Sequence, residues 1–182
     1  MKFQLNLTLK EEDYLAFNLF HNLESKQTQK INKKVRNIFI IAMVALMGIT
    51  LVTSGWDAFS STYIILLLLI TIAFALLFKH FIRHTVKMQV KTLKKTGKLP
   101  YDAESTLEFY EDKIVEITPT KRIEQSYDVL ERICLLPGRY IFLYTSSVGA
   151  YILPIAQIKS QVDYEDFWRF LCLKCKNIEQ YQ

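Results

Sequence analysis

NIFIIAMVALMGITLVTSGW, residues 37–56, and AFSSTYIILLLLITIAFALLF, residues 58–78, are two stretches without a charged side chain, separated by Asp57 alone. A helix needs about 20 mostly apolar residues to cross the hydrocarbon core of a bilayer, and helices of soluble domains are rarely apolar on every face over that length. We therefore predict transmembrane helices at residues 37–56 and 63–78, joined by an external loop at residues 57–62. A core hairpin of a soluble fold is the alternative, but the remaining segments are too small to wrap it.

Basic residues flank this predicted hairpin at both of its outer ends and are missing from the loop that joins the helices. Under the positive-inside rule, this asymmetry places both termini in the cytoplasm and the loop outside. Membrane topology thus explains the net charge of +5, and we do not expect nucleic acid as a partner. The flanking cations are Lys26, Lys30, Lys33, Lys34 and Arg36 before the first helix, and Lys79, Arg83, Lys87, Lys91, Lys94, Lys95 and Lys98 after the second.

The N-terminal segment, residues 1–36, begins with a strict alternation of polar and apolar side chains from Lys2 to Leu9. This period predicts a strand with one buried face. Thr8 and Glu11 have the spacing of a capping box, which predicts a helix from Leu9 to Leu23. The charge asymmetry places this segment in the cytoplasm. Because a lone strand is not stable, we expect its strand to pair with the sheet that follows the membrane hairpin.

Residues 79–98 have the pattern of a basic amphipathic helix that continues out of the second span. Their cations recur every three or four residues, with no acidic residue among them. Gly97 and Pro100 should end this helix. We expect the cations to reach lipid headgroups while an apolar stripe rests in the membrane interface. The stripe consists of Ile82, Val86, Val90 and Leu93.

Residues 99–182 contain short runs of strand-forming residues divided by turn residues, such as Pro137 and Gly138, and end in an amphipathic pattern from Asp163 to Ile178. Acidic residues in the first turn and basic residues in the last favour a C-terminal helix there. We predict a meandering antiparallel sheet or half-barrel, of about six or seven strands, capped by this helix. The fold class is therefore membrane α+β, with a cytoplasmic part of pleckstrin-homology-like architecture.

Several short motifs carry a resemblance to a known family. They are Arg139-Tyr140-Ile141-Phe142-Leu143-Tyr144, Tyr151-Ile152-Leu153-Pro154 and Asp166-Phe167-Trp168. Together with the N-terminal strand and helix, the two spans and the basic exit helix, they resemble the YcxB-like family of bacterial membrane proteins. Ile155 and Ala156 stand where we would expect a basic residue in that family. The resemblance implies a multi-pass protein of the bacterial inner (plasma) membrane with a YcxB-like C-terminal domain, but no mechanism, because the family has no established activity.

Candidate catalytic and metal-binding residues are few, and each has an ordinary structural interpretation. Cys172 and Cys175 form a single CxxC on the predicted C-terminal helix, without the further ligands that zinc requires. His80 and His84 share a helix face, but cations surround them. The predicted spans hold no ionisable residue, so a transport pathway is not expected. We therefore predict no catalytic residue, no cofactor and no metal, and we do not expect an enzyme.

The basic exit helix is the feature that points most directly to a function. Its cations either contact anionic lipid headgroups or serve topology alone, and both interpretations are open at this point. The candidate contacts are Lys79, Arg83, Lys87, Lys91, Lys94, Lys95 and Lys98. Ala42, Ala45 and Gly48 form a weaker pattern of small residues, through which the first span would pack in a homo-oligomer.

We therefore predict an integral membrane protein that presents a cytoplasmic binding module for a protein or a lipid headgroup. The protein partner is not identified by the sequence. Two alternatives differ from this prediction in kind. One is an accessory or immunity-type subunit that acts through its transmembrane helices, and the other is a membrane enzyme whose site forms only in the fold.

Overall fold

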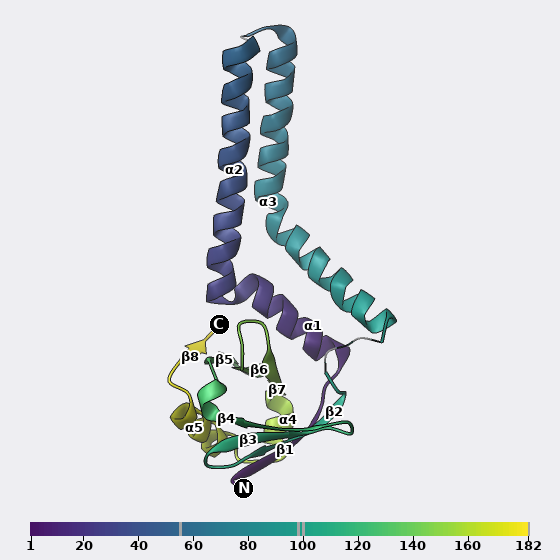
Figure 1. Ribbon diagram of the computed structural model, residues 1–182, viewed down its shortest axis with the longest axis vertical. Coiled ribbons are helices and arrows are strands. Elements are labelled where there is room, and N and C mark those ends of the chain that lie inside the picture. The colour runs from purple at the N-terminus through teal and green to yellow at the C-terminus, as the bar shows by residue number, and fades with distance from the viewer. Residues whose placement is uncertain (55, 98, 100, 182) are drawn as a thin grey trace. The chain divides into compact units, whose positions relative to one another are not determined.

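The computed structural model describes residues 1–54, 56–97, 99 and 101–181. The chain forms two compact units (Figure 1). One unit joins residues 1–17 to residues 93–182, and the other comprises residues 18–92.

The second unit is a helical hairpin. A π-helical turn, η1 (Phe20–Glu24), precedes the long helix α2 (Lys26–Ser54), and α3 (Ala58–Lys95) returns antiparallel beside it (Figure 1). The rings of Phe39 and Phe74 meet across the hairpin with centroids 3.9 Å apart. Both helices are long and apolar enough to cross a membrane, as the two uncharged stretches predicted.

Large apolar side chains cover the outside of this hairpin. Val52 is 87% exposed and Leu76 is 78% exposed, and most other large apolar residues of the two helices are exposed as well. Threonine hydroxyl groups in these helices bond to the backbone of their own helix, since Thr50 donates to the carbonyl of Leu46 (3.0 Å) and Thr71 to that of Leu67 (2.8 Å). Such bonds within one helix satisfy polar groups without water. The surface is therefore suited to an apolar solvent.

The helices extend beyond the uncharged stretches into the basic flanks. α2 begins at Lys26, so the cations before the first stretch are already helical. α3 begins at Ala58, so residues 58–62 of the predicted loop are helical instead. The helix runs without interruption through the basic segment, as predicted, and ends at Lys95. Gly97 follows with φ of +65°, a left-handed conformation that favours glycine after a helix. Lys98 and Pro100 lie outside the described residues.

The first unit contains two four-stranded sheets. Two segments of the chain build it, residues 1–17 and residues 93–182. One sheet has the order β1 (Phe3–Thr8), β2 (Glu104–Phe109), β3 (Lys113–Ile117), β4 (Arg122–Ser126). The other has the order β7 (Ala150–Pro154), β6 (Tyr140–Tyr144), β5 (Arg132–Leu136), β8 (Ile178–Gln180).

The N-terminal strand pairs with the sheet that follows the hairpin, as its alternation predicted. β1 lies antiparallel to β2, with Leu5 opposite Leu107 and Phe3 opposite Phe109. Its odd-numbered residues enter the core while its even-numbered residues are exposed. Residues about 100 positions apart in sequence thus become neighbours, and one sheet is built from both sides of the hairpin.

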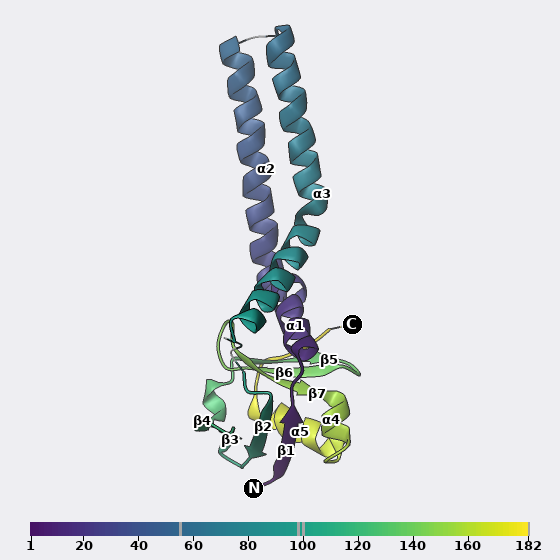
Figure 2. The same cartoon turned by 90° about the vertical axis from the view of Figure 1, so that its right-hand side faces the viewer.

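The core lies between the two sheets and is closed by α5 (Tyr164–Lys174) (Figure 2). Asp163 caps this helix, because its carboxylate accepts a hydrogen bond from the backbone N–H of Asp166 (2.9 Å). Phe167 is fully buried, and its ring meets the ring of Phe3 at 5.3 Å and that of Phe109 at 5.0 Å. The helix therefore covers the first sheet, including the strand from the N-terminus.

Two sequence predictions for this unit are corrected by the structure, and one short helix was missed. The strands form two sheets instead of one meander, because a 3-10 turn, η2 (Tyr127–Val129), carries the chain from β4 to the second sheet. The C-terminal helix ends at Lys174 instead of near Ile178, which lies in β8. β8 pairs parallel with β5, whose free edge offers main-chain hydrogen bonds that a longer helix would leave unmade. A short helix, α4 (Ile155–Lys159), was not predicted.

The helix after β1 is capped differently from the prediction. Thr8 remains in β1, and α1 (Glu11–Leu19) begins after Lys10, whose N–H donates to the carboxylate of Asp13 (2.8 Å). The other oxygen of Asp13 accepts a hydrogen bond from the hydroxyl of Tyr140 (2.8 Å). Asp13 thus caps α1 and fixes it to β6, and the predicted Thr8 and Glu11 box does not form.

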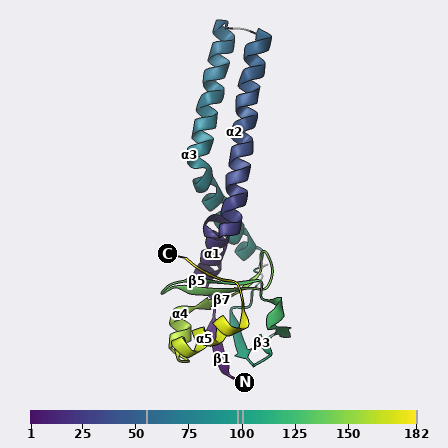
Figure 3. The ribbon, with the colours of Figure 1, turned by 90° about the vertical axis from the view of Figure 1, so that its left-hand side faces the viewer.

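α4 lies near β1 (Figure 2 and Figure 3). Two glutamine side chains from the α4 region cover the outer edge of β1. Gln157 accepts from the N–H of Thr8 and donates to its carbonyl, both at 2.9 Å. Gln161 makes the same pair of bonds with Asn6, at 2.8 and 2.9 Å. The two amides therefore occupy the main-chain groups that a further strand would use.

We expect the Gln157→Ala, Gln161→Ala double variant to unfold more easily, by about 1–2 kcal/mol, because exposed side-chain hydrogen bonds each contribute modestly. Gln157→Glu should fall between the parent and Gln157→Ala, since a carboxylate accepts from Thr8 but cannot donate to it. Urea unfolding followed by Trp168 fluorescence in a Trp56→Phe background would measure this, because the chain has two tryptophans. Equal midpoints for all variants would contradict the role assigned to the amides.

Candidate functional site

The seven cations predicted to contact headgroups lie in three different settings. Five recur every four residues along α3 and are exposed, and we call them the basic row. Lys94 forms an ion pair with Glu11, and Lys98 lies outside the described residues. The basic row consists of Lys79, Arg83, Lys87, Lys91 and Lys95.

Lys94 is bound within the protein instead of pointing to solvent alone. Its ammonium group donates a hydrogen bond to the carboxylate of Glu11, and this bond raises the pKa of Lys94 above its ordinary value. Close by, the rings of Tyr14 and Tyr101 lie 5.0 Å apart. These contacts tie the last turn of α3 to α1, so Lys94 is engaged in holding the first unit together.

The apolar stripe beside the basic row is partly inside the protein. Val86 and Val90 are 4% and 3% exposed, respectively. Ile82 and Leu93 are half-buried. The expectation that this stripe rests in the membrane interface is therefore wrong for its two central residues, because protein already covers them.

A cavity of about 190 Å³ lies at the foot of the hairpin. Its polar lining comes mainly from one face of α2. Asn32 and Lys33 follow Gln29 by three and four residues, and Arg36 follows Lys33 by three. Lys79, the first member of the basic row, lines it from α3. The apolar side chains of Leu23, Phe78 and Ile82 complete the wall. We call this space the foot cavity.

Hydrogen bonds in the foot cavity fix how its polar groups are presented. The amide nitrogen of Asn32 donates to the carbonyl of Asn22 (2.7 Å), and that of Gln29 donates to the carbonyl of Glu24 (2.9 Å). Among the described residues, neither amide oxygen accepts a hydrogen bond. The Nε atom of Arg36 is buried and has no hydrogen-bond partner among the described residues. The cavity thus combines three cations with two amide acceptors.

The sequence did not identify the foot cavity, although it contained part of the information. From the sequence alone, Lys33 and Arg36 are explained by membrane topology. Their spacing of three residues places them on one helix face, but nothing in the local pattern shows that Lys79 meets the same face. That neighbourhood depends on the register of α2 against α3.

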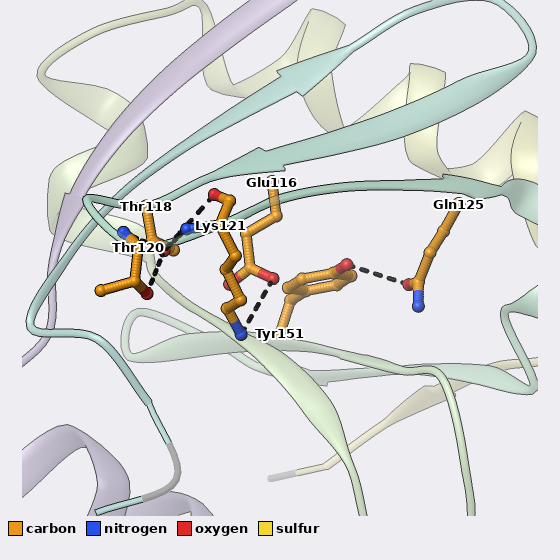
Figure 4. A network of polar contacts seen from close by, with 6 residues as sticks. All are labelled: Glu116, Thr118, Thr120, Lys121, Gln125 and Tyr151. Atoms are coloured by element: carbon orange, nitrogen blue, oxygen red, sulfur yellow. Dashed lines mark hydrogen bonds and ion pairs between the residues drawn. The ribbon is translucent and has the colours of Figure 1, made fainter.

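A second polar cluster lies at the end of β3 and β4 in the first unit (Figure 4). Glu116 is on the core side of β3, directly opposite Leu107 of β2, and Lys121 approaches its carboxylate at 4.0 Å. Tyr151 of β7 lies beside Glu116 and donates to the side-chain carbonyl of Gln125 (2.9 Å) (Figure 4). Burial raises the pKa of Tyr151 to about 12, so its hydroxyl stays protonated as a donor.

Glu116 is a carboxylate in a partly apolar place. Burial raises the pKa of Glu116. The positive charge of Lys121 lowers this pKa, and the negative charge of Asp102 raises it further. Thr118 organises the adjoining turn by accepting from the N–H of Lys121 (3.2 Å). Because each polar group of the cluster has a partner within the turn or in β7, we interpret it as a structural network joining the two sheets.

The raised pKa of Glu116 predicts a pH dependence of stability. The folded state holds this proton more tightly than the unfolded state, so stability should fall as pH rises from about 4.5 through the folded pKa and then level off. Glu116→Gln should remove this loss, and its stability relative to the parent should increase over that window. Urea unfolding at several pH values would measure the difference.

Glu124 provides a matched control with the opposite sign. A hydrogen bond from Lys113 lowers the pKa of Glu124, so its contribution is present above the unfolded pKa and lost as pH falls. Glu124→Gln should therefore lose stability relative to the parent as pH rises. A difference between parent and Glu116→Gln that is independent of pH would contradict the assignment.

The cysteines and small residues show no assembled chemical site in the described part of the chain. Cys134 and Cys175 are buried, and Cys172 is half-buried with its thiol pKa raised by burial. Among the described residues, no group of three or more His, Cys, Asp or Glu side chains could hold a metal ion. Gly48 has no atom within 4 Å of the place where a Cβ would lie, so α2 is not packed there within this chain.

Comparison of the chain with protein-family models, curated proteins and solved structures finds no match. The resemblance to the YcxB-like family and the pleckstrin-homology-like architecture therefore remain predictions.

Proposed function

We propose that this chain is an integral membrane protein of the bacterial inner membrane, with two spans and both ends in the cytoplasm, that binds anionic lipid headgroups through its basic row. The observation that supports it most is the sharp change along α3 from exposed apolar side chains to exposed cations. In this proposal, the sheet-rich unit is a pleckstrin-homology-like module held at the cytoplasmic surface, where it would also meet a protein partner.

Membrane insertion of the hairpin would bring the basic row to the lipid headgroups. Exposed apolar side chains over the length of both helices would be unfavourable in water and are favourable in hydrocarbon. A helix that leaves the bilayer carries its first cations at the depth of the headgroups, where the cytoplasmic leaflet is negatively charged. The basic row begins at Lys79, directly after the last apolar residue, Phe78. Its position is therefore the one at which lipid phosphates would lie.

We expect phosphatidylglycerol to stabilise the detergent-solubilised full chain more than phosphatidylcholine does, because exposed cations attract anionic headgroups. The Lys87→Gln, Lys91→Gln, Lys95→Gln variant should lose most of this difference. In the parent, the difference should shrink as salt is raised, since exposed charges are screened over roughly 8 Å at physiological ionic strength. Thermal unfolding in mixed micelles would measure the shift in midpoint.

The control variant removes the same number of charges from another exposed part of the protein. Lys159→Gln, Arg169→Gln, Lys176→Gln should respond to phosphatidylglycerol as the parent does, because these residues lie in or near α4 and α5. Equal responses of both triple variants would show that the basic row has no special role and that its cations serve topology alone.

A further inference from the structure

The foot cavity has the chemistry of an anion receptor with one specific occupant. Three cations, Lys33, Arg36 and Lys79, line it without an acidic side chain among the lining residues. The Nε atom of Arg36 is buried and has no hydrogen-bond partner among the described residues. A guanidinium group binds phosphate oxygens through paired N–H donors, and lysine adds point charges.

The position of the cavity points to a lipid as the source of that anion. Arg36 directly precedes the first uncharged stretch, and Lys79 directly follows the second. If the hairpin spans a bilayer as proposed above, both residues lie where apolar core gives way to headgroups. Leu23, Phe78 and Ile82 add an apolar part to the wall, which suits the glycerol and upper acyl region of a lipid and gives nothing to a free ion.

The volume of the foot cavity and its two amide oxygens indicate which kind of lipid headgroup it can hold. A volume of about 190 Å³ exceeds a water molecule's share of about 30 Å³ several-fold, yet it is below the range usual for drug-sized ligands. The amide oxygens of Gln29 and Asn32 have no hydrogen-bond donor among the described residues, so they can accept bonds from a ligand. A hydroxyl-bearing headgroup next to a phosphate would satisfy both kinds of group.

We propose that the foot cavity binds the phosphodiester of one anionic glycerophospholipid, with its headgroup hydroxyls on Gln29 and Asn32. This inference rests on the membrane insertion and lipid binding proposed above, but it differs in predicting one saturable site instead of a diffuse basic surface. The basic row attracts anionic lipids, and the foot cavity retains one of them.

Native mass spectrometry of the purified full chain tests this inference by counting bound lipids. With phosphatidylglycerol added, the parent should keep one lipid per chain after activation strips the others, and phosphatidylcholine should not occupy that site. Lys33→Gln, Arg36→Gln should weaken retention at least about tenfold, because two charge-assisted contacts are lost. Arg36→Lys should give an intermediate loss, since it keeps the charge without the paired donors.

The control variant is Lys30→Gln, Lys34→Gln, which removes two exposed cations from the same helix turns without touching the cavity lining. It should retain one lipid as the parent does. The basic-row variant at residues 87, 91 and 95 should also retain that lipid while binding fewer others. Circular dichroism and elution volume establish that each variant is folded.

The outcomes separate the two proposals. If the variant with changes at Lys33 and Arg36 retains one lipid as the parent does, the foot cavity is not the binding site of that lipid. The proposal that the basic row binds lipids is unaffected by this outcome. If phosphatidylglycerol and phosphatidylcholine bind every variant alike, the proposed function fails first. If soluble glycerol 3-phosphate displaces the retained lipid at concentrations near its own, the anion comes from solution and the lipid assignment is overturned.

Discussion

Replacing Leu5 by alanine is expected to destabilise the sheet-rich unit by about 2–5 kcal/mol, the usual range for truncating a fully buried leucine. Leu5 has no exposed surface, lies opposite Leu107 in β2 and belongs to the common core of the two sheets. Alanine would leave a cavity beneath a strand that comes from the far side of the hairpin in sequence. The size of the loss thus measures how strongly the N-terminus holds the unit.

Urea unfolding followed by Trp168 fluorescence suits this test, because Trp168 lies on α5 and packs against the core. Gln4→Ala is the matched control, since Gln4 is the neighbouring residue on the exposed face of β1. Its effect should stay within about 0.5 kcal/mol, as for most surface substitutions. Equal unfolding midpoints for Leu5→Ala and the parent would contradict the pairing of β1 with β2.

The second large effect is expected in cysteine labelling of the membrane topology, where each introduced cysteine should either react in intact cells or be fully protected. A cysteine replacing Ser54, the last residue of α2, should react with a membrane-impermeant maleimide in intact cells. A cysteine replacing the exposed Ser147 should react only after the cells are permeabilised. The reason is the distribution of cations, which are concentrated at the other ends of the two helices.

The native cysteines must not react with the maleimide when Ser54→Cys and Ser147→Cys are compared. Cys134 and Cys175 are buried, so only the half-buried Cys172 needs to be replaced by serine in the background. Both introduced cysteines should react after permeabilisation, which shows that each is accessible. Labelling of Ser147→Cys in intact cells, with Ser54→Cys protected, would reverse the orientation and place the basic row and the foot cavity outside the cytoplasm.

The split sheet has a consequence for folding. Asn6 of β1 accepts a hydrogen bond from the hydroxyl of Thr106 in β2, a contact between residues 100 positions apart. Contacts of such sequence separation form late, because the chain between them must first be ordered. Here that chain is the hairpin, and we expect the sheet to close only after both long helices have formed.

Local regularities allowed the long helices and several strands to be predicted. The two uncharged stretches indicated the hairpin, and the alternation from Lys2 to Leu9 indicated a half-buried strand that needed a partner. The turn at Pro137 and Gly138 was also evident, and Gly138 has φ of +72° in the structure. Each of these features depends on residues within a few positions of one another, where period and turn chemistry act directly.

The helical pattern after Asp163 predicted a C-terminal helix that is too long. Cys175 and Ile178 continue the apolar spacing, but Cys175 follows the last residue of α5 and Ile178 belongs to β8. Both side chains contact the same core, so burial alone does not distinguish helix from strand at these positions. The edge of β5 accounts for the outcome, because β8 supplies hydrogen-bond partners to its main-chain groups.

The sequence by itself determined the apolar hairpin, its basic flanks and the need of the first strand for a distant partner. Only the tertiary structure decided which cations are engaged and which converge: Lys94 pairs with Glu11, whereas Lys33, Arg36 and Lys79 line one cavity. The physical reason is that charge and period are properties of a segment, but the meeting of two segments depends on how their side chains pack in register.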